Sequence, residues 1–247
     1  MYGDEPDLDE CGLDESAETR RPADPSSEDV AAEYGGLKAL CELAVEAALP
    51  GRALVVRPGL VVGPYDYTGR FTYWPFRIAR GGEVLAPGSP KARVWFIDAR
   101  DLAAFVIALV ERQERGVYNA VGPAGPLSLG ELLDECIEVT ASDAVPTWVG
   151  EEFLLANDVA PFTDLPLWIP ASEGGHPVID IRKGVAAGLA FRPPSATIRE
   201  LLDAGSAHAE RVDSSGPPRA PAGLSAERER SLLAAWHASQ SASSEIL

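Results

Sequence analysis

The sequence predicts an α/β fold in which helices alternate with the strands of a parallel sheet. An apolar run at 53–56 lacks polar alternation, which is typical of a strand buried on both faces, and the run at 117–121 is another candidate for a buried strand. Segments whose apolar residues recur at helical spacing separate these runs. From residue 29 to residue 139 the order is broadly helix, strand, insertion, helix, strand, helix. This order is that of βαβ units and indicates a parallel sheet covered by helices.

The first helix is expected at 29–48, where apolar residues fall on one side of a helical wheel. Ser26 or Ser27 can cap its start, because a side-chain oxygen there accepts a hydrogen bond from a first-turn amide. Pro50-Gly51 ends it. The run at 53–56 could instead form one buried helical turn, but the flanking Pro and Gly residues favour a strand.

The later elements follow from local start and stop signals. Gly81-Gly82 ends a helix over 71–80, and Asp98 can cap a helix over 102–113. Ser128 and Glu131 form a capping box before another helix. The remaining elements are expected to be strands at 84–85, 94–97 and 147–149 and helices at 129–139, 151–157, 181–187 and 224–238.

Charge and cysteine content exclude several classes of function. The 247 residues are 46% hydrophobic, enough for a real core, and 21 basic against 38 acidic residues give a net charge of -17. Such a surface repels phosphate backbones and anionic lipids, so we expect no nucleic-acid or membrane partner. Cys11, Cys41 and Cys136 show no ligand spacing, which predicts no metal site. The sparse cysteines and the acidic N-terminus, unlike a signal peptide, predict a cytoplasmic protein.

Tyr34 and Lys38 carry the chemistry that the sequence suggests. They are four residues apart on the expected first helix and therefore share one face. A phenol ionises near pH 10, but a neighbouring ammonium favours the phenolate. The phenolate can take a proton from a substrate hydroxyl while hydride leaves the same carbon. Taken alone, this spacing also occurs on many solvated helices. Gly35 and Gly36 each cost the helix about 1 kcal/mol, which suggests that a cofactor or a neighbour approaches closely there.

Short blocks in a fixed order reinforce this pair. They are Met1-Tyr2-Gly3-Asp4, Tyr34 and Lys38 followed by Cys41-Glu42, Arg57-Pro58-Gly59-Leu60-Val61-Val62-Gly63-Pro64, Phe96-Ile97-Asp98-Ala99-Arg100-Asp101-Leu102-Ala103, Tyr118-Asn119 with Leu127-Ser128 and Glu131, and Ala187-Gly188-Leu189-Ala190-Phe191-Arg192-Pro193. Together they cover most of residues 1–203, and their order resembles that of extended short-chain dehydrogenases/reductases of the NAD-dependent epimerase/dehydratase type. The resemblance implies a partial Rossmann-like parallel sheet, its C-terminal part, with a small α+β substrate-binding domain.

The resemblance also implies an activity and a site. The activity would be NAD(P)-dependent oxidation, reduction or epimerisation at a carbinol or carbonyl carbon of a small molecule. Tyr34 would be the catalytic acid/base, and Lys38 its partner and a ligand of the ribose. The residues against the nicotinamide of NAD or NADP would be Pro58, Gly59 and Leu60. The residues lining the substrate cleft would be Asp66, Arg70, Tyr73, Trp74 and, as a weaker candidate, Arg93.

The same resemblance divides the chain into four parts. These are an incomplete NAD(P)-binding part at 1–140 with a substrate-domain insertion around 65–97, a C-terminal substrate-domain part at 141–205, a linker at 206–222, and a helix and tail at 223–247. The linker is indicated by its Ser, Pro and Ala content.

One feature of the family is missing from these residues. No Gly-rich turn such as G-x-G-x-x-G follows a strand, and the paired glycines at 81–82 and 174–175 are interpreted as turns. We therefore expect an N-terminally truncated member that binds NAD or NADP weakly or not at all. A mis-assigned start or broken gene is favoured, and a truncated protein whose partner covers its sheet edge is the alternative. That alternative would be a cofactor-free interaction or regulatory module, and a homo-oligomer is compatible with both.

Two smaller expectations concern the substrate and the histidines. Nucleotide-sugar epimerases place a diphosphate-binding Arg where this chain has Val94, which makes a substrate without phosphate at least as plausible. Residues alternate faces on a strand, so the adjacent Arg93 does not simply replace it. His176, His208 and His237 are isolated in the sequence and are expected at the surface.

Overall fold

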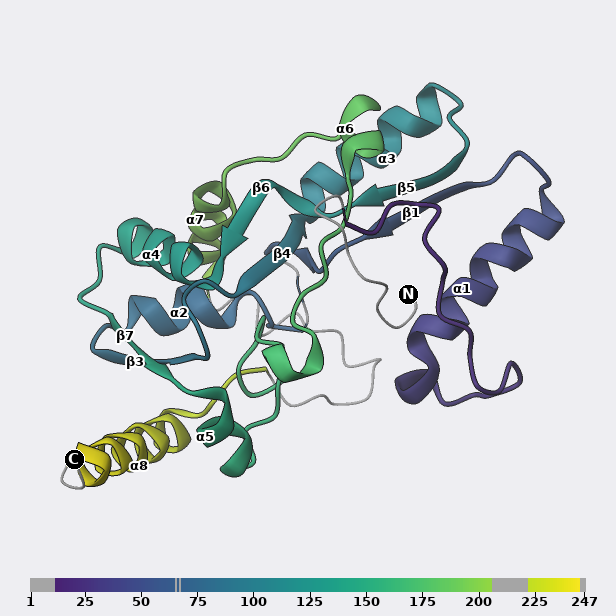
Figure 1. The fold of residues 1–247 in the computed structure, drawn as a ribbon. Coiled ribbons are helices and arrows are strands. Elements are labelled where there is room, and N and C mark those ends of the chain that lie inside the picture. Colours follow the sequence, from purple (N-terminus) through teal and green to yellow (C-terminus); the bar gives the residue numbers. More distant parts are fainter. Residues whose placement is uncertain (1–11, 65, 67, 206–221, 245–247) are drawn as a thin grey trace. The chain divides into compact units, whose positions relative to one another are not determined.

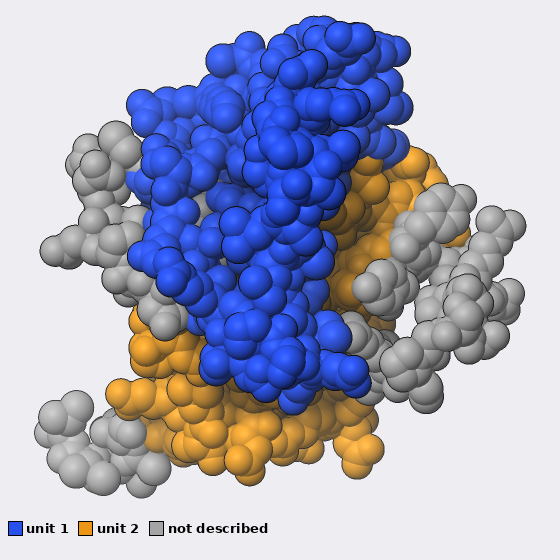
Figure 2. Space-filling view, turned by 90° about the vertical axis from the view of Figure 1, so that its right-hand side faces the viewer, with its two compact units in different colours: residues 1–60, 100–122, 177–190 blue, residues 61–99, 123–176, 191–247 orange. Residues whose placement is uncertain are grey.

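The computed structural model describes residues 12–64, 66, 68–205 and 222–244. It divides into two compact units, coloured separately in Figure 2. Unit 1 comprises residues 1–60, 100–122 and 177–190, and unit 2 comprises residues 61–99, 123–176 and 191–247. Each unit is therefore assembled from segments that are far apart in the sequence, and each is described by itself.

Unit 1 is built on a parallel pair of strands, β1 (Leu54–Pro58) and β5 (Gly116–Ala120). The register runs from Leu54 opposite Gly116 to Pro58 opposite Ala120. The two strands coincide with the runs at 53–56 and 117–121, so the expected parallel arrangement is confirmed. The helices α1 (Val30–Ala48), α3 (Ala99–Glu111) and α6 (Arg182–Ala186) complete this unit, with α6 packed on β5 (Figure 1).

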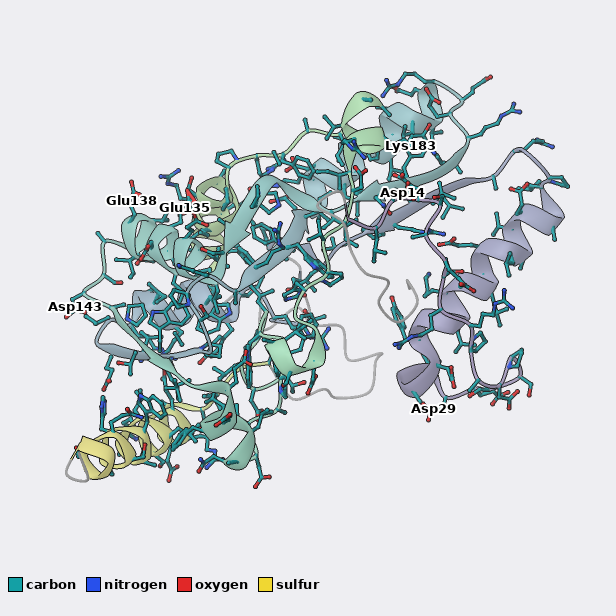
Figure 3. All side chains as sticks on the ribbon, in the orientation of Figure 1. Asp14, Asp29, Glu135, Glu138, Asp143 and Lys183 are labelled. Carbon is teal, nitrogen blue, oxygen red and sulfur yellow. The ribbon has the colours of Figure 1, made fainter. Side chains whose placement is uncertain are left out.

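The start of α1 differs from the expectation. Asp29, labelled in Figure 3, accepts the Ala32 amide at 3.0 Å, so its carboxylate caps the helix. The hydroxyl of Ser27 instead accepts the amide of Asp29, one step earlier. Glu33 has non-helical backbone angles, so α1 is kinked directly before Tyr34.

Unit 2 contains two small sheets. The strands β2 (Val61–Val62), β4 (Arg93–Asp98) and β6 (Gly122–Ser128) form one, with β2 and β4 parallel. The strands β3 (Glu83–Pro87) and β7 (Val145–Val149) form the other, which is also parallel. The helices of this unit are α2 (Tyr73–Ala79), α4 (Leu129–Thr140), α5 (Glu151–Ala156), α7 (Pro194–Ala204) and α8 (Ala226–Ser244), with one 3-10 turn at Ala171–Glu173.

The core of unit 2 lies where α4 packs against α2 and α7. The inner face of α4 is fully buried through Leu129, Leu132, Leu133 and Cys136. The capping box predicted at its start is confirmed, because the Ser128 hydroxyl accepts the Glu131 amide and the Glu131 carboxylate accepts the Ser128 amide. A fixed start and a continuous apolar face therefore define this helix.

The C-terminal helix α8 is held in unit 2 by a buried ion pair. The Arg77 Nε donates to the Glu229 carboxylate at 2.6 Å, and the side chains are only 9% and 3% exposed. The same carboxylate accepts the Leu85 amide at 3.1 Å, and the Arg77 guanidinium also donates to the carbonyls of Gly81 and Glu83. These bonds join α8 to α2 and to the start of β3.

The structure thus has mixed α/β architecture with parallel strands, as expected. The strand β6, the helix α7 and the two-residue β2 were not expected, since Gly122–Ser128 is rich in Gly and Pro and α7 opens on Pro194. Within the described residues, no helix is both long and apolar enough to cross a membrane.

Candidate functional site

The helix α1 carries the Tyr34 and Lys38 pair in unit 1. Both residues lie beyond the Glu33 kink, one helical turn apart, so their side chains leave the same side of the helix. Both are exposed, Tyr34 at 60%. The phenol and the ammonium are therefore accessible to a ligand rather than buried in packing.

A bidentate ion pair joins α1 to β1. Nε and Nη2 of Arg57 donate to the two carboxylate oxygens of Glu42 at 3.0 and 2.7 Å, and Nη1 donates to the Glu15 carbonyl at 3.3 Å. The side chains of Arg57 and Glu42 are 7% and 17% exposed. Parallel hydrogen bonds of this kind fix orientation as well as distance. The pair thus sets where the Tyr34 and Lys38 helix lies relative to the strand.

The loop predicted to face a nicotinamide begins at the end of that strand. Pro58 is exposed, and Gly59 and Leu60 are half-buried. The Gly59 amide donates to the Ala120 carbonyl at 3.2 Å, which anchors the loop to the end of β5. The loop therefore leaves the carboxyl edge of the parallel pair, where ligands bind in open α/β sheets.

A polar network also lies near the carboxyl edge of the β1 and β5 pair. Asn119 is fully buried, and its side-chain amide donates to the carbonyls of Leu13 and Asp180. Nearby, Lys183 of α6 donates to the Val117 carbonyl at 2.6 Å and lies over the Tyr118 ring (Figure 3). These contacts tie the segments around residues 13 and 180 to β5 and were not predicted, because their partners are distant in the sequence.

Gly36, between the two proposed catalytic residues, has a structural explanation. A Cβ at this position would lie 2.5 Å from the backbone nitrogen of Pro22 and 2.7 Å from its Cα. No side chain fits there without movement of the backbone. We expected a cofactor or a neighbouring segment to approach the two glycines closely. At Gly36 the neighbour is the protein's own segment around Pro22.

The predicted substrate residues belong to unit 2. Asp66 makes a local turn, accepting the amide and hydroxyl of Thr68 at 2.8 and 2.6 Å. Arg70 lies 4.7 Å above the Phe162 ring, and Arg93 is exposed on β4. Because the Asp66 carboxylate already accepts these two hydrogen bonds, part of its hydrogen-bonding capacity is used within its own turn.

Tyr73 and Trp74 of α2 pack into unit 2 more deeply than expected. Trp74 is fully buried, and its indole N–H donates to the Pro166 carbonyl at 2.8 Å. Tyr73 packs edge-on against it and contacts Gly223, where a Cβ would lie 2.0 Å from the tyrosine ring. Burial, with a smaller contribution from Glu229, raises the pKa of Tyr73. Trp74 therefore serves as core, and Tyr73 remains a neutral phenol.

The expectation for the histidines was wrong at His176. Its ring is half-buried, packs edge-on on Trp95 with centroids 4.9 Å apart, and hydrogen-bonds the Leu167 carbonyl at 2.9 Å. His237 is exposed as expected and contacts Glu83 at 2.7 Å, and His208 lies outside the described residues. Trp95 is far from His176 in the sequence, so no local pattern marks their contact.

The comparison with family models agrees with these motifs. The NAD dependent epimerase/dehydratase family matches residues 1–121, close to half of the chain. This part contains α1, the Arg57 and Glu42 pair and the loop after β1. A search of curated proteins found no match.

Solved structures show the same fold at low sequence identity. The UDP-glucuronic acid 4-epimerase from Bacillus cereus, in complex with NAD, is 14% identical with a TM-score of 0.53, over 80% of this chain and 57% of that one. A putative epimerase from Burkholderia cenocepacia is 19% identical with a TM-score of 0.51, over 79% and 57%. The Bordetella bronchiseptica enzyme WbmF, in complex with NAD+, is 13% identical with a TM-score of 0.50, over 75% and 55%. The chain spans little more than half the length of these proteins.

Proposed function

We propose that this chain is the part of an NAD(P)-dependent oxidoreductase or epimerase of the extended short-chain type that carries the catalytic residues Tyr34 and Lys38. Its reaction would occur at a carbinol or carbonyl carbon of a small molecule. The observation that carries the proposal is the buried Arg57 and Glu42 pair, which fixes α1 against the strand that leads into the loop at 58–60. An accessible phenol and ammonium, Tyr34 and Lys38, stand on that helix.

In this proposal each residue has a distinct task. Tyr34 takes the proton of a substrate hydroxyl, or returns it to a carbonyl oxygen, while hydride moves at the same carbon. Lys38 favours the ionised phenol and donates hydrogen bonds to ribose hydroxyls. Backbone groups of Pro58, Gly59 and Leu60 would hold the nicotinamide. Bound NAD or NADP would supply the carbon that accepts or returns the hydride.

The donor set present suits the nicotinamide-ribose end of the cofactor better than its diphosphate end. Ammonium and phenol groups match ribose hydroxyls, but no Gly-rich phosphate turn occurs in the 247 residues. The acidic balance, with a net charge of -17, adds no attraction for a diphosphate. We therefore propose weak binding of NAD(P) by this chain, with contacts concentrated at the nicotinamide end.

The substrate residues are proposed from unit 2. Asp66, Arg70, Tyr73 and Arg93 would line the substrate site, and Trp74 would support it from the core. The position usual for a diphosphate-binding Arg holds Val94, which is buried. This favours a substrate without a nucleotide diphosphate.

Saturation-transfer NMR with NAD tests the cofactor assignment on the 247-residue protein. Saturation is expected to be stronger at the nicotinamide protons than at the adenine protons. Loss of a charged hydrogen bond corresponds to about tenfold or more in affinity, so Lys38→Met should raise the dissociation constant obtained from the nicotinamide signal by about that factor. Lys91→Met is the matched control, since Lys91 is exposed in unit 2, and it should leave the signal unchanged.

Two results would count against the assignment. Equal saturation at both ends of NAD, or a signal indifferent to Lys38→Met, would mean that the Tyr34 and Lys38 face does not bind the nicotinamide. No saturation at any concentration of NAD would instead favour a cofactor-free interaction module.

A further inference from the structure

An aromatic cluster in unit 2 contains polar atoms that the proposed chemistry does not use. Trp95 of β4 packs edge-on against His176, and Phe162 lies on the same histidine with ring centroids 6.3 Å apart. Arg70 lies over the Phe162 ring at 4.7 Å. The four side chains come from two separate stretches of unit 2, 61–99 and 123–176, so only the folded unit brings them together.

The hydrogen bond to Leu167 fixes which nitrogen of His176 carries hydrogen. Nε2 is 2.9 Å from the Leu167 carbonyl oxygen, which can only accept, so Nε2 donates. In the neutral ring Nδ1 is then an acceptor. Burial lowers the pKa of His176 below its ordinary value, against a smaller opposing effect of the bond to Leu167, and so supports the neutral ring.

Two complementary groups in this cluster lack a partner. Among the residues that the structure describes, neither the Trp95 indole N–H nor the His176 Nδ1 makes a hydrogen bond, although both atoms are buried. Buried polar groups are normally hydrogen-bonded, so each such exception calls for an explanation. One is a donor and the other an acceptor, and their rings are in contact.

The chemistry of the pair selects one kind of ligand group. A single oxygen with two hydrogen bonds of about 2.9 Å can join nitrogens up to roughly 6 Å apart. Only a hydroxyl group or a water molecule both accepts from the indole and donates to the imidazole through one oxygen. A ketone cannot donate to Nδ1, and an ammonium cannot accept from the indole.

Backbone strain supports a binding role for this cluster. Phe162 and Leu167 have φ angles of 58° and 64°, in the left-handed region that residues with a Cβ rarely adopt. Phe162 supplies a ring of the cluster, and Leu167 supplies the carbonyl that orients His176. Strained residues of this kind gather at binding sites.

We propose that Trp95 and His176 together bind one hydroxyl oxygen of an uncharged alcohol or polyol, with the Phe162 ring as an apolar wall. The inference rests on the proposed function only in identifying this ligand with the substrate. It narrows the substrate class to compounds that carry a hydroxyl group on a carbon other than the reacting one.

Cyclohexanol and cyclohexanone test the proposal on the whole chain, because they share a shape and differ in the donated hydrogen. In ¹⁵N-labelled protein, cyclohexanol should shift the Trp95 indole and the His176 Nδ1 resonances saturably, with Trp95→Phe and His176→Phe giving the assignments. Cyclohexanone should bind at least about tenfold more weakly, since it leaves Nδ1 without a partner. In His176→Phe the preference for the alcohol should vanish, whereas His237→Phe should retain it.

Equal binding of alcohol and ketone by the unchanged protein would overturn the proposal, and this comparison needs no variant to fold. Indole and Nδ1 resonances that are hydrogen-bonded without additive and unmoved by cyclohexanol would also overturn it, because an internal water would then hold the pair. A saturable preference for cyclohexanol without any nicotinamide signal from NAD would refute the proposed function and leave this inference standing.

Discussion

The substitution Glu42→Ala tests whether the pair that joins α1 to β1 stabilises unit 1. It removes the carboxylate that accepts two hydrogen bonds from Arg57, whose side chain is only 7% exposed. Removal of one partner of a buried pair costs about 3–5 kcal/mol. Because Glu42 is 17% exposed, we expect the lower end, about 3 kcal/mol.

Urea unfolding followed by circular dichroism measures this loss. With a slope of about 1–3 kcal/mol per molar urea, the midpoint should fall by roughly 1–3 M. The double variant Arg57→Met with Glu42→Leu should recover most of the stability, since no buried charge then remains. Glu46→Ala is the control on the same helix, because the Glu46 carboxylate bonds the Gly51 amide at an exposed position. Its cost should stay below about 1 kcal/mol.

A loss of less than about 1 kcal/mol for Glu42→Ala would refute the reasoning. The pair would then behave like a solvated surface pair. The position of Tyr34 and Lys38 would have to depend on other contacts.

Three further substitutions test separate parts of the structure. Glu229→Ala leaves the buried Arg77 guanidinium without its carboxylate and should lower the free energy of unfolding by about 3–5 kcal/mol in urea titrations. A change near zero would mean that this ion pair does not hold α8 in unit 2. Gly36→Ala gains about 1 kcal/mol of helix propensity, yet its Cβ would lie 2.5 Å from Pro22, and overpacking costs about 1–3 kcal/mol, so thermal melts should show net destabilisation. For His176, burial lowers the folded-state pKa below the unfolded value of 6.5, so the unfolded chain binds more protons and stability falls as the pH drops below that value. His176→Phe should abolish this fall in urea midpoints compared across pH, and an unchanged pH dependence would contradict the burial.

The sequence was most informative where local patterns decide the structure. The largely apolar runs at 53–56 and 117–121 pair as the parallel strands β1 and β5. The Ser128 and Glu131 capping box starts α4 as expected. In both cases neighbouring residues determine the element, so no distant contact was needed to predict it.

Long-range contacts decide the features that sequence patterns missed. The strand β6 is rich in Gly and Pro and exists through its pairing with β4. The Arg57 and Glu42 pair spans 15 residues, and the contact between Trp95 and His176 spans a longer stretch still. No periodicity marks such partners in a single sequence. The spacing of Tyr34 and Lys38 could therefore be predicted, but the contacts that orient their helix could not.

Titration with nicotinamide mononucleotide, followed by backbone amide shifts, tests the central claim most directly. The amides of 34–38 and of Gly59 and Leu60 should shift together and saturate with one dissociation constant, because both segments belong to one proposed nicotinamide site. Shifts confined to one segment, or shifts that saturate at clearly different concentrations, would show that the helix and the loop do not form a common site.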